Sequence, residues 1–387
     1  MDSASELHAG PKVGDRLDVT IVDIAFGGEG VARTDGLVVF IPFVAPGEQV
    51  RVEVVERKRD FARARVLEIL HPSPDRIAPA CRYFGECGGC QYQHLDYPSQ
   101  LRIKHAQVAA HFERIAGLPA EVVSPVVPCP TAYGYRNRIM VRRQWNKPEQ
   151  RAVLGYLRHD SRLVVDVERC EIAEPALNEQ LGRLRENPPP RNAPKAVLRI
   201  MPDDWNLHRD SFFQTNFHLL PGLVDAVRRC VKESGARHVV DAYCGIGFFA
   251  LQLADMVESF VGVEIDTQAI RCARANAAQR HATQGEFIAG KTEELLGSLL
   301  ARFDAAKTAV VLDPPRAGCH AAGLEALMHA HPAQIVYVSC HPATLARDAK
   351  RLCSEGGYTL HRVTPLDMFP QTQHIECVAD LRLNQAG

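Results

Sequence analysis

The sequence predicts an α/β protein in three parts: a small amino-terminal β-barrel, a central mixed α+β domain and a carboxy-terminal Rossmann-like domain. Three observations support this prediction. Short alternating apolar and polar runs, separated by turns, occupy residues 11–70. A region rich in cysteine and proline follows over 71–202. Apolar runs then alternate with helical stretches over 203–387, which is the βαβ rhythm of a doubly wound parallel sheet.

The composition limits the classes to which such a chain can belong. Its 387 residues suggest two or three domains, and 46% apolar with 24% charged residues is ordinary globular usage. Lys and Arg number 45 against 46 Asp and Glu, which excludes a uniformly basic nucleic-acid binder but not a local basic face. The start is polar and no apolar run approaches about 18 residues. We therefore expect a cytoplasmic protein without membrane contact. Its twelve cysteines suit metal-binding or catalytic thiols better than a disulfide scaffold.

The amino-terminal part has the pattern of a barrel that binds oligonucleotides. Alternation over 15–23, a glycine-rich turn at 26–30 and later apolar runs indicate short strands. Residues 57–65 hold five cations around Phe61. Two interpretations stay open for this stretch: a solvated hairpin, or a surface that neutralises phosphates and stacks the bases of a single strand.

Four cysteines in the central region form a candidate metal site. Cys81, Cys87 and Cys90 are a tight trio, and Cys170 follows some 80 residues later. From spacing alone, four thiolates could hold zinc or an iron–sulfur cluster, and a trio without metal is the third alternative. The spacing differs from the Cys-x3-Cys-x2-Cys trio of radical adenosylmethionine enzymes. The cysteines expected only to pack are Cys129, Cys230, Cys272, Cys319 and Cys353.

A second basic stretch lies within the central region at 133–143. Cations alternate there with apolar residues, so one strand face would present Arg136, Arg138 and Arg142. This face is either an exposed strand surface or part of an RNA groove.

The first turn of the Rossmann-like domain is a candidate cofactor site. Gly245 and Gly247 allow a tight turn and close approach of a ligand to a helix amino terminus. Glu264 follows about 20 residues later at a strand end, where it can accept hydrogen bonds from ribose hydroxyls. The third glycine of the dinucleotide fingerprint is missing, so S-adenosyl-L-methionine, which has no pyrophosphate, fits better. Asp313 precedes two prolines at the end of a later strand, which gives it a rigid position.

Two further residues suggest covalent chemistry. Cys340 lies where a strand passes into a helix, and the field of a helix amino terminus favours the thiolate, the nucleophilic form. Glu376 lies between Ile375 and Cys377 in an apolar run that leads into the last strand. A carboxylate there is costly to bury unless it is protonated or functional.

Five motifs follow one another along the carboxy-terminal part of the chain. They are Phe212-Phe-Gln-Thr-Asn216, the glycine turn at Asp241, Asp313-Pro-Pro-Arg, Ser339-Cys-x-Pro-Ala-Thr and Phe369-Pro-x-Thr-x-His-x-Glu376. This ordered set resembles the uridine-5 RNA methyltransferases. The amino-terminal barrel resembles the TRAM domain that some members carry, and the likeness covers nearly the whole chain. One departure is His341, which stands where the family usually has Asn and could raise the thiolate fraction or pack.

The resemblance implies a role for each candidate residue. Cys340 is implied as the nucleophile and Glu376 as the base. Some members hold a [4Fe–4S] cluster with the same three-plus-one cysteines, which implies this cluster at Cys81, Cys87, Cys90 and Cys170. The residues implied to hold adenosylmethionine or the target base are Gln214, Tyr243, Gly245, Gly247, Phe248, Glu264 and Asp313.

These inferences predict a monomeric enzyme that forms 5-methyluridine in ribosomal or transfer RNA. The alternatives are a cytosine-5 RNA methyltransferase, whose usual Pro-Cys nucleophile motif is missing here, and a non-catalytic RNA-binding iron–sulfur protein. The pairing of Cys340 with Glu376 argues against the second alternative.

Overall fold

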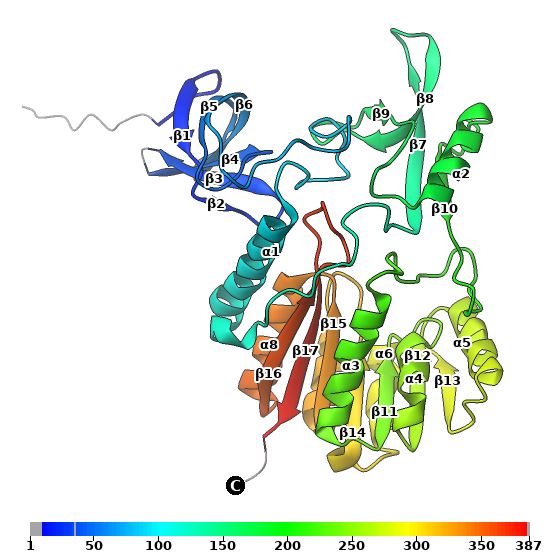
Figure 1. Ribbon diagram of the computed structural model, residues 1–387. Helices are drawn as coiled ribbons and strands as arrows, with labels where there is room; N and C mark the ends of the chain where they lie inside the picture. Colours follow the sequence, from blue (N-terminus) through cyan, green and yellow to red (C-terminus); the bar gives the residue numbers. More distant parts are fainter. Residues whose placement is uncertain (1–9, 35, 385–387) are drawn as a thin grey trace, which may run out of the picture. The chain divides into compact units, whose positions relative to one another are not determined.

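The computed structural model describes residues 10–34 and 36–384, and the chain divides into two compact units (Figure 1). The first unit comprises Met1–Ile103, Ile139–Leu198 and Pro370–Gln373, and it joins the barrel to most of the central region. The second comprises Lys104–Arg138, Arg199–Phe369 and His374–Gly387. Among the described residues, no helix is long and apolar enough to span a membrane.

The amino-terminal region forms a six-stranded, strongly curved sheet, as its alternating pattern predicts. Its strand order is β1-β5-β6-β4-β3-β2, and neighbouring strands are antiparallel except β4 and β6, which are parallel. The strands are β1 (Arg16–Thr20), β2 (Asp23–Ile24), β3 (Glu29–Thr34), β4 (Leu37–Pro42), β5 (Gln49–Arg57) and β6 (Phe61–His71).

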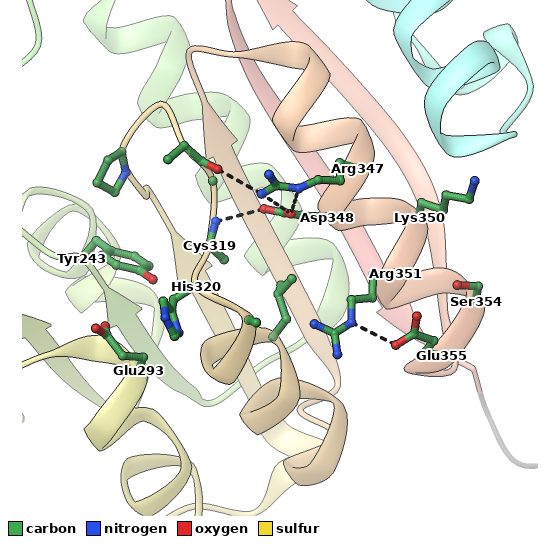
Figure 2. A pocket seen from close by; sticks show the side chains of 15 residues that line it. Tyr243, Glu293, Cys319, His320, Arg347, Asp348, Lys350, Arg351, Ser354 and Glu355 are labelled. Carbon is green, nitrogen blue, oxygen red and sulfur yellow. Dashed lines mark hydrogen bonds and ion pairs between the residues drawn. The ribbon is translucent and has the colours of Figure 1, made fainter.

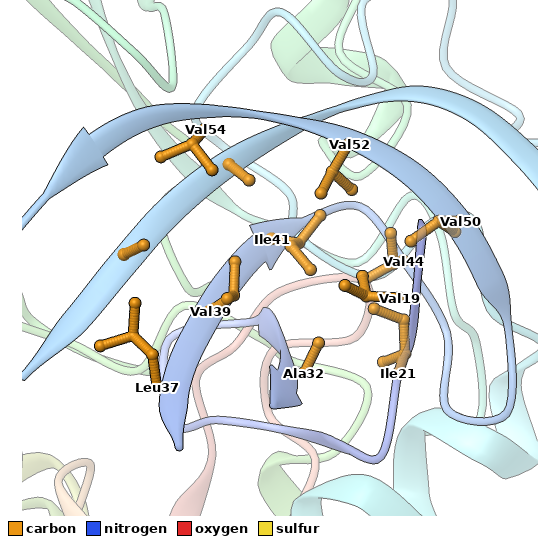
Figure 3. Packing of buried hydrophobic residues seen from close by; sticks show 12 residues of the cluster. Val19, Ile21, Ala32, Leu37, Val39, Ile41, Val44, Val50, Val52 and Val54 are labelled. Atoms are coloured by element: carbon orange, nitrogen blue, oxygen red, sulfur yellow. The ribbon is translucent and has the colours of Figure 1, made fainter. Parts of the chain in front are cut away.

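The core of this sheet is built from the inward-facing half of each strand. β4 and β5 alternate between buried and more exposed positions, so their apolar residues point to one side. Figure 3 shows these side chains enclosed by the curved strands. The cluster is rich in valine and isoleucine, which suit a pleated, half-buried surface. Its labelled members are Val19, Ile21, Ala32, Leu37, Val39, Ile41, Val44, Val50, Val52 and Val54.

The basic stretch at 57–65 is the β5–β6 hairpin, and its cations face carboxylates. Arg63 is bonded to Glu29 at 3.1 Å, and Arg65 to Glu53 at 2.7 Å. The Phe61 ring packs edge-on against Phe40, with ring centroids 5.7 Å apart. The hairpin itself is therefore observed, and its ion pairs leave less free charge for RNA than the sequence suggests. Its binding of RNA stays a prediction.

The rest of the first unit carries a four-stranded sheet and the cysteine-rich loop. The sheet order is β10-β7-β8-β9, and a loop containing Cys87 and Cys90 joins it through a bond from Gly88 N to the Leu157 carbonyl oxygen at 2.9 Å. The elements are β7 (Arg138–Asn146), β8 (Arg151–Leu157), β9 (Val164–Asp166), α2 (Pro175–Glu186) and β10 (Lys195–Arg199). Arg138 and Arg142 belong to β7. The expectation that Arg136 shares their strand face is wrong, because β7 begins after it.

The second unit is built on the predicted doubly wound sheet, in the order β13-β12-β11-β14-β15-β17-β16. The five strands from β13 to β15 in this order are parallel to one another, whereas β17 is antiparallel to both of its neighbours. β14 and β15 are buried at every position, as strands covered on both faces must be. The strands are β11 (His238–Ala242), β12 (Ser259–Glu264), β13 (Gly285–Ala289), β14 (Thr308–Leu312), β15 (Gln334–Ser339), β16 (Tyr358–Leu366) and β17 (Glu376–Leu383).

Helices cover both faces of this sheet, with α3, α4 and α5 on one face and α6, α7 and α8 on the other (Figure 1). They are α3 (Leu220–Ser234), α4 (Phe248–Leu253), α5 (Thr267–Gln279), α6 (Thr292–Leu300), α7 (Ala321–Ala330) and α8 (Pro342–Glu355). Short turns are η3 (Ala254–Met256) and η4 (Ala305–Lys307). Before them in the chain come α1 (Tyr97–His111), which runs from the first unit into the second, η1 (Phe112–Ala116) and η2 (Ala120–Val122).

Candidate active site

The candidate site lies at the carboxyl edge of the parallel sheet. β11, β12, β14 and β15 are parallel, so the residues that end them meet at one edge. This edge carries three candidates from the sequence, Glu264, Asp313 and Cys340, together with Asp241 at the start of the glycine turn. β11 and β14 are adjacent although β12 and β13 intervene in the chain, so the strand order reverses here, where α/β sheets bind their ligands.

The glycine turn between β11 and α4 has the backbone that a bound cofactor requires. Gly245 has φ +54°, and a Cβ placed on it would meet no heavy atom within 4 Å. The turn is therefore open there, and its backbone can approach a ligand. Gly247 differs, because its Cβ would lie 2.5 Å from the Phe287 ring. Gly245 thus suits ligand approach, whereas Gly247 is needed for packing.

Two carboxylates brace this turn. Glu264 accepts hydrogen bonds from Gly245 N at 3.2 Å and from Asp266 N at 2.8 Å. Asp241 accepts from Ala250 N at 2.8 Å, and its other oxygen has no hydrogen-bond partner among the described residues. Burial, together with the charges of Asp313 and Glu264, raises the pKa of Asp241 to about 8. The turn therefore offers a buried, unsatisfied oxygen beside open backbone.

The motif that contains Gln214 supports the same turn from a neighbouring segment. Phe213 packs edge-on against Phe248, with ring centroids 5.5 Å apart, and Trp205 lies 5.1 Å from the same ring. Gln214 is buried, and its carbonyl accepts from the Asn137 amide at 3.0 Å. Phe248 is thus a packing residue of the second unit, and its contact with a cofactor remains a prediction.

Strand register brings Cys340 and Glu376 together. β15 and β17 are antiparallel, with Ser339 opposite Cys377. Cys340 follows β15 directly and so lies across from Glu376, the first residue of β17, whose charge acts on its thiol. Cys340 is partly exposed, whereas Glu376 is 4% exposed. A nucleophile and a base distant in sequence thus become neighbours.

The electrostatics of this pair are set by burial and by two further groups. Burial, together with the charges of Glu376 and Asp313, raises the pKa of the Cys340 thiol to about 11, although the Arg316 guanidinium opposes this rise. Burial and the charge of Asp313 raise the pKa of Glu376 well above its usual range, and Arg316 again lowers it. Desolvation also raises the pKa of Asp313. Arg316 therefore favours the charged form of both the thiol and the carboxyl.

Arg316 and His374 are site residues that the sequence reasoning did not select. Arg316 donates a hydrogen bond to His374 Nδ1 at 2.9 Å. Burial first, and then nearby cations, lower the pKa of His374 to about 4, so the ring is neutral and can accept from Arg316. Both residues stand inside motifs, Asp-Pro-Pro-Arg and His-x-Glu, and this adjacency is the signal that could have identified them.

A buried ion pair holds the segment that leads toward Glu376. Lys104 Nζ lies 2.5 Å from Asp367 Oδ1, both side chains are fully buried, and Lys104 also donates to the Phe369 carbonyl at 3.1 Å. A charge of this kind is stable in the interior only with its partner. The start of the Phe369–Glu376 motif is therefore anchored in the core of the second unit.

His341, the departure from the family pattern, caps helix α8. Its Nδ1 accepts from Thr344 N at 3.3 Å, which satisfies one amide of the first turn. Burial, followed by the charge of Arg316, lowers the pKa of His341. A neutral capping imidazole does not act as a cation beside the thiol, so of the two roles left open the structure favours the structural one.

A pocket of about 760 Å³ adjoins the candidate site on the face covered by α6, α7 and α8. Figure 2 shows Tyr243, Glu293 and His320 on one side of it and the basic residues of α8 on the other. Tyr243 has φ +64°, and its ring lines this pocket. Its contact with a cofactor stays a prediction.

The role of Arg316 can be tested on the thiol itself. Replacing Arg316 with glutamine removes the cation that lowers the pKa of Cys340, so the thiolate fraction at neutral pH should fall by about tenfold for each unit of pKa rise. The measurement is the rate at which iodoacetamide alkylates Cys340 as a function of pH, read by mass spectrometry of its peptide. We expect the curve to move to higher pH in Arg316→Gln and to stay nearer the wild type in Arg316→Lys. Lys350→Gln on α8 is the control, and an unchanged curve in Arg316→Gln would refute the role.

The four cysteines of the first unit influence one another, although they do not form a site for a single ion. Within residues 10–34 and 36–384, no three His, Cys, Asp or Glu side chains are grouped as ligands of one metal. Burial, together with the charges of Cys170 and Cys81, raises the pKa of Cys87 to about 11. The pKa of Cys90 is raised by burial and by all three other thiols. The quartet is therefore close enough for its charges to interact.

Two family models match the chain. The model described as tRNA (Uracil-5-)-methyltransferase matches residues 203–383, and the TRAM domain model matches residues 11–67. The first range contains the sheet edge described above, and the second contains the curved six-stranded sheet.

Similar proteins and structures cover nearly the full chain. An uncharacterized RNA methyltransferase of Nostoc is 31% identical over 97% of this chain and 98% of its own length. Another, from Gloeobacter violaceus, is 32% identical over 95% of this chain and 96% of its own length. The crystal structure of Pyrococcus abyssi tRNA (uracil-54, C5)-methyltransferase in complex with S-adenosyl-L-homocysteine has a TM-score of 0.70 and 26% identity, and it covers 94% of this chain and 100% of that one.

Proposed function

Because the chain belongs to the family of RNA methyltransferases that join a TRAM domain to a tRNA (uracil-5-)-methyltransferase domain, we propose that it methylates C5 of a uridine in transfer or ribosomal RNA. The observation that carries the proposal is the strand register that sets Cys340 against Glu376 at the carboxyl edge of the sheet. A thiol beside a buried carboxyl, next to an open glycine turn, suits methyl transfer to a carbon that first needs activation.

The first step is nucleophilic. C5 of uracil is too weakly nucleophilic to take a methyl group directly. The Cys340 thiolate adds to C6, the electrons of the C5–C6 double bond move toward the O4 carbonyl, and C5 becomes carbanion-like. Adenosylmethionine, when bound, supplies an electrophilic methyl group on a sulfonium. C5 takes this methyl group, and the electrons of the broken carbon–sulfur bond stay on the cofactor sulfur. Arg316 supports the step because it favours the thiolate form of Cys340.

The second step is elimination. The Glu376 carboxylate removes the proton from C5, the C5–C6 double bond forms again, and the C6–S bond breaks to release the Cys340 thiolate. Both residues act in their deprotonated forms, and burial raises the pKa of both. The methyl-transfer rate should therefore rise with pH through the neutral and alkaline range. The target base must leave its stack to be reached from both faces.

Residues of the glycine turn would hold the cofactor. Gly245 presents open backbone, Glu264 retains lone pairs for the ribose hydroxyls, and Asp241 has an unsatisfied buried oxygen. Asp313 follows β14 and would orient either the cofactor or the uracil ring by hydrogen bonding. These positions meet at the switch point of the sheet, and this placement supports adenosylmethionine at this edge.

The proposal is tested by methyl transfer to RNA. The full-length protein is incubated with labelled adenosylmethionine and either transfer RNA or large-subunit ribosomal RNA transcripts, and the modified nucleosides are identified by chromatography. Labelled 5-methyluridine is the expected product from one of the two. 5-Methylcytidine would support the cytosine-5 alternative, and no methylated nucleoside from either RNA would refute the proposed activity.

We also propose that Cys81, Cys87, Cys90 and Cys170 hold a [4Fe–4S] cluster. A [4Fe–4S] cluster is held by four cysteine thiolates. The quartet supplies four thiols whose charges influence one another, which supports a shared site. Bound iron would favour the thiolate forms that burial alone disfavours. The cluster would hold the loop that contains Cys87 and Cys90 against the four-stranded sheet of the first unit.

Metal analysis of the protein purified without oxygen tests the cluster. We expect iron and acid-labile sulfide in equal amounts and a broad visible absorption band. The iron, the sulfide and the absorption band should all be lost in Cys170→Ser. They should be kept in Cys272→Ser, which alters a half-buried thiol on α5. Stoichiometric zinc without iron would show that the thiolates hold a different metal.

A further inference from the structure

A second pocket, of about 520 Å³, lies entirely within the first unit. Its walls come from the barrel, from the loop that contains Cys87 and Cys90, and from strands β7 and β8 with the residues after them. We propose that this pocket binds one unpaired nucleotide of the RNA substrate, other than the uridine that is methylated. This inference rests on the proposed function, because it takes RNA as the ligand. The target uridine would lie at Cys340, in the other unit.

The barrel side of the pocket presents a preorganised aromatic ring. Phe43 follows β4 and has φ +62°, an uncommon and strained backbone state for a bulky residue. Arg76, which is ion-paired with the buried Glu48, donates to the Phe43 carbonyl at 2.9 Å and holds this conformation. The His159 ring meets Phe43 edge-on, with centroids 4.9 Å apart. Both rings line the pocket, and aromatic faces are what unstacked bases bind.

The sheet side supplies an apolar contact and an uncompensated cation. Met140 and Arg142 lie two residues apart on β7, on the same face. Met140 is 45% exposed. Arg142 is half-buried and has no carboxylate partner among the residues that the structure describes, whereas Glu29, the acidic residue of the pocket, is paired with Arg63. The net charge of the pocket therefore favours an anion such as a phosphate.

Glycine backbone forms the rest of the lining. A Cβ on Gly28 would lie 2.7 Å from Gln91 Cβ, and one on Gly88 would lie 3.2 Å from the Leu157 carbonyl oxygen. The barrel turn and the cysteine loop therefore pack directly against their neighbours, and a larger residue would move these walls. Since Gly88 stands between Cys87 and Cys90, the pocket wall is part of the loop that the proposed cluster would brace.

Rings, a thioether and an unpaired guanidinium are the groups with which proteins hold a splayed-out nucleotide. The same lining suits an apolar peptide less well, because Arg142 would be buried against it without a counter-charge. The location of the pocket also favours RNA as the ligand, since part of its wall belongs to the TRAM domain of an RNA methyltransferase. RNA is therefore the ligand that this surface fits.

The test measures binding of a fluorescent, mixed-sequence single-stranded RNA to the full-length protein by anisotropy over a range of salt. Met140→Glu places an anion in the pocket. Its matched control is Val197→Glu, on the neighbouring strand β10, 43% exposed and outside the pocket. Arg142→Gln removes the free cation, and Lys232→Gln on α3 is its control. Met140 and Val197 are exposed, so both glutamate variants should fold, which circular dichroism verifies.

We expect Met140→Glu to weaken binding by about 5- to 100-fold, the range that loss of one stacked base produces. Arg142→Gln should lower the slope of log affinity against log salt by about one, as loss of one phosphate contact does. Binding of a duplex of the same sequence should change little in either variant. Photo-crosslinking of RNA that carries 4-thiouridine should label peptides containing Phe43, Met140 or His159.

Equal affinities for Met140→Glu and Val197→Glu, or crosslinks confined to the β5–β6 hairpin, would refute the proposal that this pocket binds a nucleotide. Methyl transfer measured in parallel separates this failure from failure of the proposed function. If the wild-type protein methylates RNA while the pocket variants bind it normally, only the pocket assignment falls. If the wild type methylates neither RNA class, the proposed activity falls whatever the binding data show.

Discussion

Replacing Cys340 with alanine will abolish methyl transfer, with a fall in the single-turnover rate of at least about 10³-fold, a loss typical of removing a catalytic nucleophile. Without the thiolate, C6 gains no electron pair and C5 stays too weak a nucleophile to take the methyl group. The measurement is transfer of labelled methyl to RNA in a single turnover. RNA affinity should stay within a few-fold of the wild type, because the change removes one sulfur atom from a partly exposed side chain.

Cys353→Ala is the matched control for this variant. Cys353 is a half-buried thiol on α8, the helix that Cys340 precedes, and the proposed mechanism gives it no role. The control should keep its methyl-transfer rate. Full activity in Cys340→Ala would overturn the covalent mechanism. Loss of activity in both variants together with loss of folded signal would point to damage to the helix instead.

Replacing Glu376 with glutamine will trap the enzyme on its RNA. The substitution keeps the size of the side chain but removes the base, so C5 should still be methylated while its proton stays in place and the C6–S bond cannot break. We expect turnover to fall by about 10²- to 10⁴-fold. A covalent protein–RNA species should accumulate, visible as a slow band on a denaturing gel after addition of adenosylmethionine.

Two controls make this result specific. Glu355→Gln changes an exposed carboxylate on α8 that is paired with Arg351, and it should turn over normally. The double variant Cys340→Ala, Glu376→Gln should give no slow band, because the adduct needs the thiol. Normal turnover without an adduct in Glu376→Gln would assign proton removal to another group, and Asp313 would be the first to test, since its charge influences both Cys340 and Glu376.

Electrostatics connect these two predictions. The proposed mechanism requires both Cys340 and Glu376 in their deprotonated forms, yet burial raises the pKa of each. Arg316 is the cation that opposes this effect for both, and neutral His374 holds it by one hydrogen bond. In the proposed mechanism, burial of the two groups is therefore offset by the positive charge of Arg316, which favours the deprotonated form of each.

Much of the second unit was predictable from the chain because its signals are local. The apolar runs at Val239, Phe260, Ala309 and Ile335 are strands β11, β12, β14 and β15, since strands buried on both faces are continuously apolar. The glycines between β11 and α4 mark the cofactor turn because φ above zero is costly for other residues. Each of these features depends only on neighbours in the sequence.

Charge pairing was not predictable in this way. The cations of residues 57–65 suggest an RNA surface, but carboxylates from β3 and β5 face Arg63 and Arg65 across the sheet. Likewise, His341 could have been a cation beside the thiol, and the fold uses it as a helix cap. Which charge meets which depends on strand pairing, and strand pairing is a long-range property.

The sequence by itself determined the class of fold, the cofactor turn, the thiol and carboxyl of the candidate site, and the cysteine quartet, because residue type and local spacing specify each of them. Only the tertiary structure decided that Ser339 pairs with Cys377 and so brings Cys340 opposite Glu376. Only the tertiary structure shows the hydrogen bond from Arg316 to His374, and only it brings three distant segments of the first unit together around one pocket. The physical reason is that register and packing arise from the summed burial of many side chains, and no single segment of the chain contains that information.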